Sequence, residues 1–228
     1  MKQLALDIGL LTGPTLKNFV AGPNAAVVSH LALWVGEQSR ADTRSPVPTY
    51  LWGISGSGKS HLLKSAREAL REQGATVGWL DASVLEPPPF NEAWAAIMLD
   101  DVHLYTAVQQ HAAFTWFVNA QSLSRWVMAA GALPPADLSL RDDLRTRLGW
   151  GHVFGLQVLS ESERRAVLRQ AADARGVFLS DEVMDFMLTR FSRDLGSLMD
   201  LLELIDGFAL QSKRAVTIPM IKSMLENL

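Results

Sequence analysis

The sequence Gly53-Ile54-Ser55-Gly56-Ser57-Gly58-Lys59-Ser60 matches the complete phosphate-binding pattern G-x-x-x-x-G-K-[ST]. An apolar stretch at 47–52 precedes it and a helical pattern at 61–72 follows, as the pattern requires. Glycines let backbone N–H groups turn toward phosphate oxygens, and the helix N-terminus adds partial positive charge. The sequence therefore predicts a di- or triphosphate site, in which Lys59 contacts the β- and γ-phosphates and Ser60 holds Mg²⁺.

Two acidic residues, Asp100 and Asp101, follow another apolar stretch at 95–99, 40 residues after Ser60. Open parallel sheets bind their ligands at the carboxyl ends of the strands. We therefore expect Asp100 to hold Mg²⁺ through water, and Asp101 to orient or deprotonate the attacking water. Two acids after a strand are also typical of a solvated loop, and only their spacing from the phosphate loop favours the catalytic interpretation.

The remaining pattern alternates strands with helices up to about Leu159 and then becomes helical only. Such alternation predicts right-handed crossovers and a parallel sheet covered on both faces. The fold class is therefore α/β, with a five-stranded parallel αβα core of the P-loop NTPase type followed by a small all-helical lid domain. Predicted strands are 47–52, 76–80, 95–99, 126–130 and 153–158, and the predicted domains are 1–12, 13–159 and 160–228.

Several helix boundaries are predicted from capping residues. Asn24 is expected to cap the first helix, which runs to about Gln38. Ser160 and Glu163 form a capping box at the start of the lid, and Ser180 is expected to cap its second helix. The apolar face of the first helix is predicted to contain Ala25, Val28, Leu31, Ala32 and Val35.

The composition excludes several classes of protein. The chain has 228 residues, of which 48% are apolar, so it can bury a substantial core and is not disordered. It has no cysteine and no long uncharged apolar stretch, so we expect a cytoplasmic protein without disulfides or a membrane span. A net charge of −3 without a Lys/Arg cluster argues against a broad nucleic-acid surface. The five histidines lack metal-ligand spacing and are interpreted as structural or surface residues.

Alternating apolar residues mark the first few positions of the chain, Gln3-Leu4-Ala5-Leu6-Asp7-Ile8. This segment could dock in an apolar pocket of another protein, with Gln3 hydrogen-bonding and Leu6 and Ile8 as anchors. It could equally be a strand on its own core, and the pattern alone leaves both interpretations open.

Taken together, these motifs resemble the DnaA-related branch of the AAA+ ATPases over almost the full length of the chain. Residues 15–22 resemble that branch's adenine-binding segment, 143–151 its box VII, and 193–195 its sensor II. The resemblance implies an arginine finger at Arg147 and a lid arginine at Arg193. It also implies ADP or ATP with Mg²⁺ as cofactors, bound by Phe19, Val20, Gly53, Gly56, Ser57, Gly58, Lys59, Ser60, His61, Asp100 and Arg193.

Within that branch, the chain is most similar to the Hda family, the regulatory inactivators of DnaA. We expect no DNA-reading domain after the lid, because the sequence ends at Leu228. Only about 14 residues separate the second and third strands, and the first residues resemble a clamp-binding peptide. The resemblance implies that Gln3, Leu4, Leu6 and Ile8 bind the β sliding clamp of DNA polymerase III. DnaA is then the second partner, DNA is reached only through the clamp, no membrane is involved, and a homodimer is left open.

The sequence departs from the family pattern at two places. Asp7 stands where the clamp peptide usually has proline. Residues 129–133 offer no polar sensor I side chain, so intrinsic ATP hydrolysis is expected to be weak or absent.

Three other functions remain open. They are a self-contained ATPase or helicase-loading motor acting through Asp101 in cis, a small-molecule P-loop kinase, and an adaptor without chemistry. Arg147 could instead form a surface ion pair with Asp142 or Asp143, and Arg193 could be a lid-surface residue.

Overall fold

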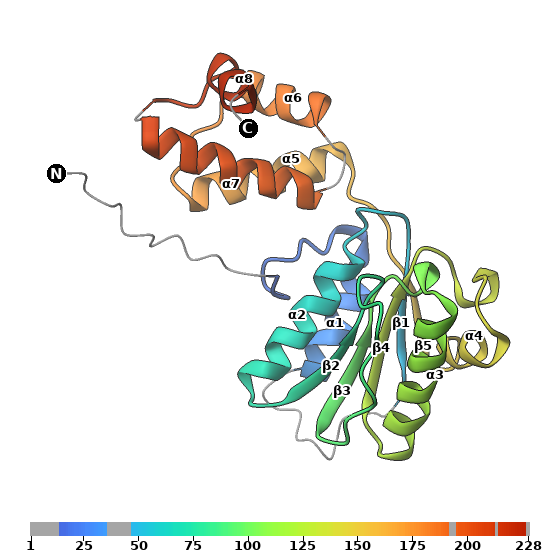
Figure 1. Ribbon diagram of the computed structural model, residues 1–228. Coiled ribbons are helices and arrows are strands. Elements are labelled where there is room, and N and C mark those ends of the chain that lie inside the picture. The colour runs from blue at the N-terminus through green and yellow to red at the C-terminus, as the bar shows by residue number, and fades with distance from the viewer. Residues whose placement is uncertain (1–13, 36–46, 192–194, 213, 227–228) are drawn as a thin grey trace. The chain divides into compact units, whose positions relative to one another are not determined.

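The computed structural model describes residues 14–35, 47–191, 195–212 and 214–226 (Figure 1). These residues divide into two compact units. The core unit contains the described residues up to Gly155, except 22–24 and 53–58. The lid unit contains those two short segments together with the described residues from Leu156 onward.

A five-stranded parallel sheet forms the centre of the core unit, in the order β2-β3-β4-β1-β5. This confirms the predicted αβα core and the presence of all five predicted strands, although the fifth ends at Gly155 and not at residue 158. The first strand begins at Thr49 rather than at residue 47, since Pro48 has no N–H to donate to a neighbouring strand. The strands are β1 (Thr49–Trp52), β2 (Thr76–Leu80), β3 (Trp94–Leu99), β4 (Trp126–Gly131) and β5 (His152–Gly155).

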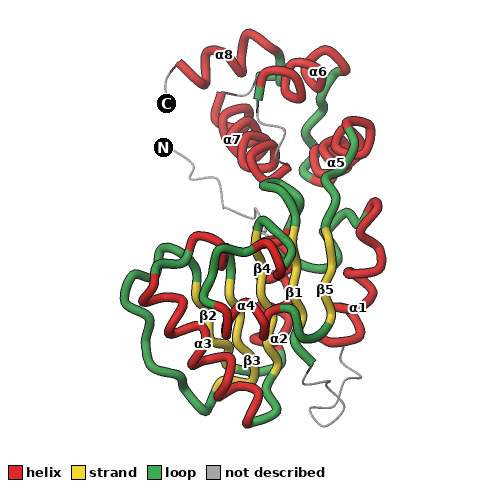
Figure 2. Tube along the Cα trace, turned by 90° about the vertical axis from the view of Figure 1, so that its right-hand side faces the viewer, coloured by secondary structure: helices red, strands yellow, loops and turns green. Residues whose placement is uncertain are grey.

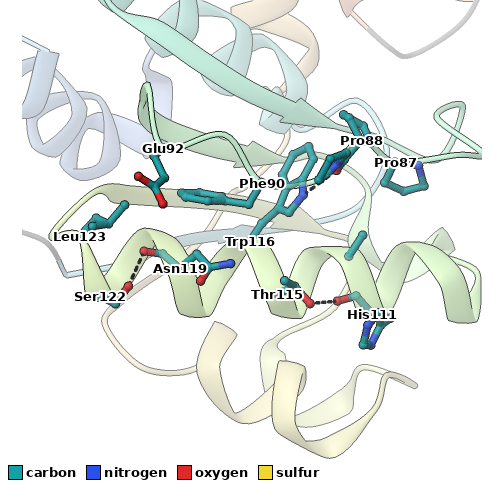
Figure 3. Close-up of a pocket in the computed structure, with 12 residues that line it drawn as sticks. Pro87, Pro88, Phe90, Glu92, His111, Thr115, Trp116, Asn119, Ser122 and Leu123 are labelled. Atoms are coloured by element: carbon teal, nitrogen blue, oxygen red, sulfur yellow. Dashed lines mark hydrogen bonds between the residues drawn. The ribbon is translucent and has the colours of Figure 1, made fainter.

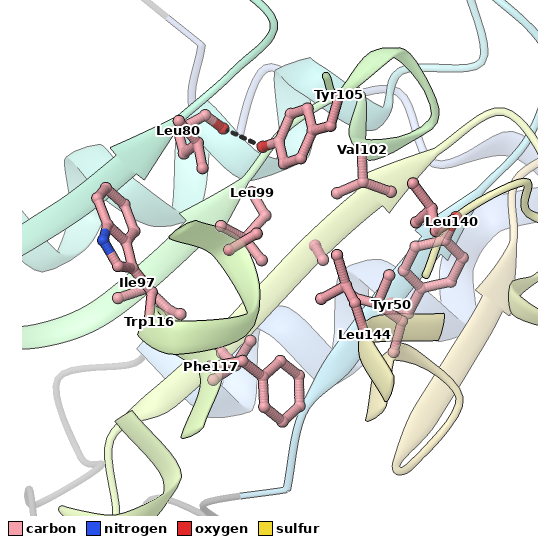
Figure 4. Packing of buried hydrophobic residues seen from close by; sticks show 14 of the residues in the cluster. Tyr50, Leu80, Ile97, Leu99, Val102, Tyr105, Trp116, Phe117, Leu140 and Leu144 are labelled. Atoms are coloured by element: carbon pink, nitrogen blue, oxygen red, sulfur yellow. Dashed lines mark hydrogen bonds between the residues drawn. The ribbon is translucent and has the colours of Figure 1, made fainter. Parts of the chain in front are cut away.

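Helices cover both faces of this sheet (Figures 1 and 2). Helices α1 (Ala25–Val35) and α2 (Lys59–Glu72) lie on one face, and α3 (Ala107–Ser122) and α4 (Asp142–Leu148) on the other. Between the sheet and α3 and α4 lies a cluster that includes Tyr50, Leu99, Phe117 and Leu144, each with at most 1% of its surface exposed (Figure 4). Truncating a buried aromatic of this kind typically costs about 3–5 kcal/mol of stability, so this cluster contributes strongly to the stability of the sheet.

The structure corrects two predictions about the start of the core. Asn24 does not cap α1 but ends a short 3-10 turn, Gly22–Asn24, and its side-chain amide bonds both the N–H and the C=O of Gln157 at 2.9 Å. The buried face of α1 is Val27, Leu31, Trp34 and Val35, whereas Ala25 and Ala32 are exposed. The buried face therefore differs from the predicted one, because the large Trp34 ring stacks on Trp126 of β4 and buries more apolar area than the alanines could.

The lid unit is helical, as predicted. Its capping box is present, since Ser160 Oγ accepts from the Glu163 N–H at 3.3 Å and the Glu163 carboxylate accepts from the Ser160 N–H at 2.7 Å. Ser180 caps the next helix, also as predicted. A separate apolar core that includes Leu168, Met184 and Leu202 holds the four helices together. They are α5 (Glu161–Ala174), α6 (Asp181–Arg190), α7 (Leu195–Ser212) and α8 (Ile218–Glu226).

Candidate nucleotide-binding site

The glycine-rich segment forms a loop between β1 and α2. Gly56 and Gly58 have φ angles of 78° and 95°, in the left-handed region that favours glycine. A Cβ atom at Gly53 would lie 2.6 Å from the Leu156 carbonyl oxygen, so this position has no room for a side chain. Ser57 is 5% exposed, and its hydroxyl has no hydrogen-bond partner among the described residues. A buried hydroxyl without a partner typically costs about 1–3 kcal/mol, and a phosphate oxygen is the kind of acceptor that would satisfy it.

Directly after this loop, the structure brings together three of the predicted site residues, Lys59, Ser60 and Asp100. Lys59 begins α2 and is 7% exposed. Burial lowers the pKa of its amine, while the carboxylates of Asp101 and Asp100 act in the opposite direction. Burial raises the pKa of Asp100, opposed by a hydrogen bond from Ser60. A hydroxyl and a carboxylate in contact at the end of β3 are suitable oxygen ligands for Mg²⁺.

Asp101 differs from Asp100 in its backbone conformation and in the solvent exposure of its side chain. Its φ and ψ angles are 50° and 44°, a left-handed conformation that is uncommon outside glycine but best tolerated by asparagine and aspartate. Its side chain is 42% exposed, whereas the whole Asp100 residue is only 5% exposed. His103 Nδ1 lies 4.0 Å from its Oδ1, a neighbour that the sequence did not point to. Asp101 can therefore contact water while Asp100 is enclosed.

The segment predicted to bind adenine contacts the first turn of α2. Thr15 and Asn18 bond each other's N–H groups through their side chains, at 2.8 and 3.1 Å. His61 Nε2 lies 3.1 Å from the Thr15 carbonyl oxygen, and the rings of Phe19 and His61 have centroids 5.4 Å apart. Phe19 and Val20 are half-buried. An aromatic ring is thus placed beside the helix that begins with Lys59.

The predicted finger, Arg147, lies on α4 against an aromatic platform formed by Phe114, Phe117 and Trp150. Its guanidinium carbon is 5.3, 6.0 and 5.5 Å from the three ring centroids. The alternative of an ion pair with a neighbouring aspartate is not observed. Among the described residues, Asp142 pairs with Arg145 at 2.6 Å and Asp143 with Arg141 at 2.7 Å, and none of the ion pairs includes Arg147. Arg147 as a whole residue is half-buried, and its guanidinium lies against these rings.

The end of β4, where a sensor I side chain is expected, is apolar. Residues 129–133 contribute no polar side chain, and β4 is buried along its whole length. A Cβ atom at Gly131 would lie 2.2 Å from the Tyr50 hydroxyl, which donates to the Leu133 carbonyl at 2.8 Å. The Tyr50 hydroxyl therefore occupies the space in which a side chain at position 131 would lie.

Some predicted residues lie outside the part of the chain that the structure describes: Arg193, Gln3, Leu4, Leu6 and Ile8. Among the described residues, no group of three or more His, Asp or Glu side chains is arranged to hold a metal ion. In the same residues, no helix has both the length and the apolar character needed to cross a membrane.

A pocket that the sequence did not predict lies on the opposite side of the core unit from α1 and α2, and includes none of the nucleotide-site residues (Figure 3). It has a volume of about 500 Å³ and lies between the segment Pro87–Phe90 and α3. Trp116 Nε1 donates to the Pro88 carbonyl at 3.0 Å, and the fully buried Gln109 amide contacts the carbonyls of Asp81, Ala82 and Val84. The connection between β2 and β3 is thereby fixed to α3.

Comparison with known proteins identifies the family. Residues 161–225 match the family model described as "Hda, lid domain". An uncharacterized protein from Haemophilus influenzae is 32% identical over 98% of this chain and 98% of its own length. The chain belongs to the Hda-like, DnaA-related AAA+ proteins. This confirms the resemblance inferred from the motifs.

Solved structures agree with this assignment at the level of the fold. Domain III of the replication initiation protein DnaA from Thermotoga maritima has a TM-score of 0.73 at 21% identity, and the match covers 99% of this Hda-like protein and 98% of that domain. AMPPCP-bound DnaA from Aquifex aeolicus has a TM-score of 0.65 at 22% identity, over 84% of this chain and 64% of its own. The RuvB branch migration motor of T. maritima has a TM-score of 0.65 at 15% identity, over 94% of this chain and 72% of its own. The α/β core with a helical lid is thus an AAA+ fold.

Proposed function

We propose that this Hda-like protein binds ADP or ATP with Mg²⁺ and stimulates, through Arg147, the hydrolysis of ATP that is bound to DnaA. The nucleotide's phosphates would contact the 53–58 loop and Lys59, and its adenine would contact Phe19 and Val20. Ser60 and Asp100 would hold Mg²⁺, which screens the phosphate charge when it is bound. Arg193 is proposed as the lid arginine that faces the nucleotide.

The observation that carries this proposal is the environment of Arg147. A guanidinium that stabilises charge developing at a γ-phosphate must be able to approach that phosphate. Arg147 is half-buried on its aromatic platform, while both neighbouring aspartates pair with other arginines. An arginine supplied in trans increases phosphoryl-transfer rates by about 10³- to 10⁵-fold in GTPases. We propose that Arg147 increases the rate of hydrolysis of DnaA-bound ATP in the same way.

The protein's own site is proposed to bind nucleotide better than it hydrolyses it. The apolar end of β4 leaves no sensor I side chain to position a water molecule, although Asp101 is exposed enough to contact one. Measured turnover of the isolated protein separates this proposal from a motor that hydrolyses ATP in cis. Appreciable hydrolysis without DnaA, abolished by Asp101→Asn, would favour the motor.

Clamp binding is proposed for Gln3, Leu4, Leu6 and Ile8, and rests on the sequence similarity alone. It would restrict the reaction to clamps loaded on DNA, so that the initiator is inactivated after replication starts. A pull-down on purified β sliding clamp with Gln3→Ala as the control tests this part. Equal retention of both proteins would contradict it.

The central experiment compares Arg147→Ala with Arg145→Ala, a matched change on the same helix. Hydrolysis of DnaA-bound ATP is measured with clamp-loaded DNA present. We expect Arg147→Ala to lower the stimulated rate by about 100-fold or more, as loss of a transition-state contact does. Arg145→Ala should retain most of it, because Arg145 is paired with Asp142. Normal stimulation by a folded, clamp-binding Arg147→Ala protein would refute the finger assignment and favour either the motor or an adaptor.

A further inference from the structure

His61 stands two residues after Lys59, in the first turn of α2. Successive residues of an α-helix are rotated by about 100°, so its side chain leaves the helix on a different side from that of Lys59. It contacts the segment 15–19, which reaches α2 from a distant part of the sequence, 46 residues away at Thr15. One turn of helix thus carries both a phosphate-binding lysine and a contact to the segment proposed to bind the base.

The hydrogen bond defines which nitrogen of His61 carries a proton. A carbonyl oxygen can only accept, so Nε2, 3.1 Å from the Thr15 oxygen, must donate. His61 therefore donates a hydrogen bond through Nε2 to the carbonyl at the start of segment 15–19.

The segment that His61 contacts has a closed local structure of its own. The reciprocal bonds between Thr15 and Asn18 form a turn, and Phe19 follows this turn directly. His61 bonds the carbonyl at the start of the turn and contacts the ring at its end, with centroids 5.4 Å apart and planes at 52°. Both ends of the turn are thereby held against α2.

We infer that His61 is the positioning residue that fixes segment 15–20 to the helix of Lys59, so that the site selects adenine over guanine nucleotides. This inference rests on the proposed nucleotide site and adds a specific role for one residue. The phosphates are held by the loop and Lys59, which His61 does not contact through the bonds described above. Loss of His61 should therefore weaken recognition of the base much more than recognition of the phosphates.

The experiment uses the full chain with His61→Leu, and with His61→Gln as the conservative variant. Glutamine places an N–H donor the same number of bonds from Cα as Nε2 of histidine, so it can bond the same carbonyl. Binding of ADP and GDP is measured by competition with a fluorescent ADP analogue. In a separate arm without nucleotide, tryptic cleavage after the exposed Lys17 is followed by mass spectrometry.

For His61→Leu we expect about a tenfold loss of ADP affinity, because the partly buried Thr15 carbonyl loses its hydrogen bond and segment 15–20 is no longer fixed. GDP affinity should change by less than about twofold, and cleavage after Lys17 should be about tenfold faster. His61→Gln should restore the ADP-to-GDP ratio to within about threefold of the wild-type value. Equal losses of ADP and GDP affinity, an unchanged ratio, or a wild-type protein that does not discriminate would overturn the inference.

Failure of the proposed function gives a different result. If the wild-type protein binds neither nucleotide, or if Lys59→Ala does not abolish binding, the nucleotide site itself is wrong. If Lys59→Ala abolishes binding while His61→Leu retains the ADP-to-GDP ratio, the site stands and the role of His61 is refuted. Should His61→Leu fail to fold, His61→Asn carries the same test, since it is polar but has a shorter side chain that does not reach Thr15.

Discussion

Replacing Gly131 with alanine tests the packing at the end of β4 directly. The new Cβ would lie 2.2 Å from the Tyr50 hydroxyl and 3.2 Å from a Val102 methyl, whereas Cβ contacts below 3.0 Å essentially never occur. Tyr50 is 1% exposed, so its ring has no free space to enter. Either β4 shifts, or the hydroxyl leaves the Leu133 carbonyl that it bonds at 2.8 Å.

The expected cost follows from these two effects. Overpacking by one methyl group typically costs about 1–3 kcal/mol, and a net intramolecular hydrogen bond is worth about 1 kcal/mol. We therefore expect Gly131→Ala to lower the free energy of unfolding of the core unit by about 2–3 kcal/mol. In a Tyr50→Phe background the hydroxyl is absent, so the same substitution should cost about 1 kcal/mol or less. The coupling between the two positions is then about 1–2 kcal/mol, within the range for contacting residues.

Urea denaturation followed by tryptophan fluorescence measures this cycle. All seven tryptophans lie between Trp34 and Trp150, in the core unit, so the signal reports on that unit and not on the lid helices. The four proteins of the cycle are compared by their midpoints at a common slope. Additive effects of the two substitutions would show that the hydroxyl is not what excludes a side chain from position 131.

Three further predictions concern other parts of the molecule. Gln109→Leu removes the amide that contacts three carbonyls of the β2–β3 connection, and should lower core stability by about 2 kcal/mol in the same urea assay. Ser160→Ala removes the α5 cap, which is worth about 1 kcal/mol, so hydrogen exchange of the first-turn amides of α5 should become about fivefold faster. Burial lowers the pKa values of His30 and His61, so below the unfolded value of 6.5 the unfolded chain binds more protons than the folded one. Stability should therefore fall between pH 7.5 and 5.5, and a His30→Gln variant should lose less over this range; an unchanged slope would contradict the assignment.

Local patterns predicted much of the fold because their causes are local. The five strands were found from apolar stretches whose side chains pack on immediate neighbours in the sheet, and the Ser160–Glu163 box needs only four consecutive residues. The same holds for the positions of the 53–58 loop and of Asp100 and Asp101, because each directly follows a strand in the chain and so lies at its carboxyl end.

Long-range contacts explain what the sequence did not predict. Asn24 looked like a cap, but its amide bonds Gln157, which is 133 residues away. The predicted buried face of α1 was right for Leu31 and Val35 but included exposed alanines and omitted Trp34. Trp34 is buried because it packs on Trp126, a distant residue that the helical pattern does not indicate.

The same limit applies to the candidate site. The resemblance of residues 143–151 to box VII suggested a finger at Arg147, but the sequence did not predict its aromatic platform, which combines residues from two helices and the turn after the second. The Phe114 ring, more than 30 positions earlier, is one example. His61 was assigned to the site without a role, because its partner Thr15 is recognised only when the chain is folded.

The way in which Arg147 is held has a consequence for competition between anions. A guanidinium in an ion pair must first release its carboxylate before it can bind a phosphate, and that exchange cancels much of the gain. Aromatic rings attract the cation through their faces and do not neutralise it, so no carboxylate of the described residues has to leave Arg147 before the γ-phosphate contact proposed for it. A substitution that places an aspartate or glutamate beside these rings should thus reduce the proposed stimulation of ATP hydrolysis, even though Arg147 itself is unchanged.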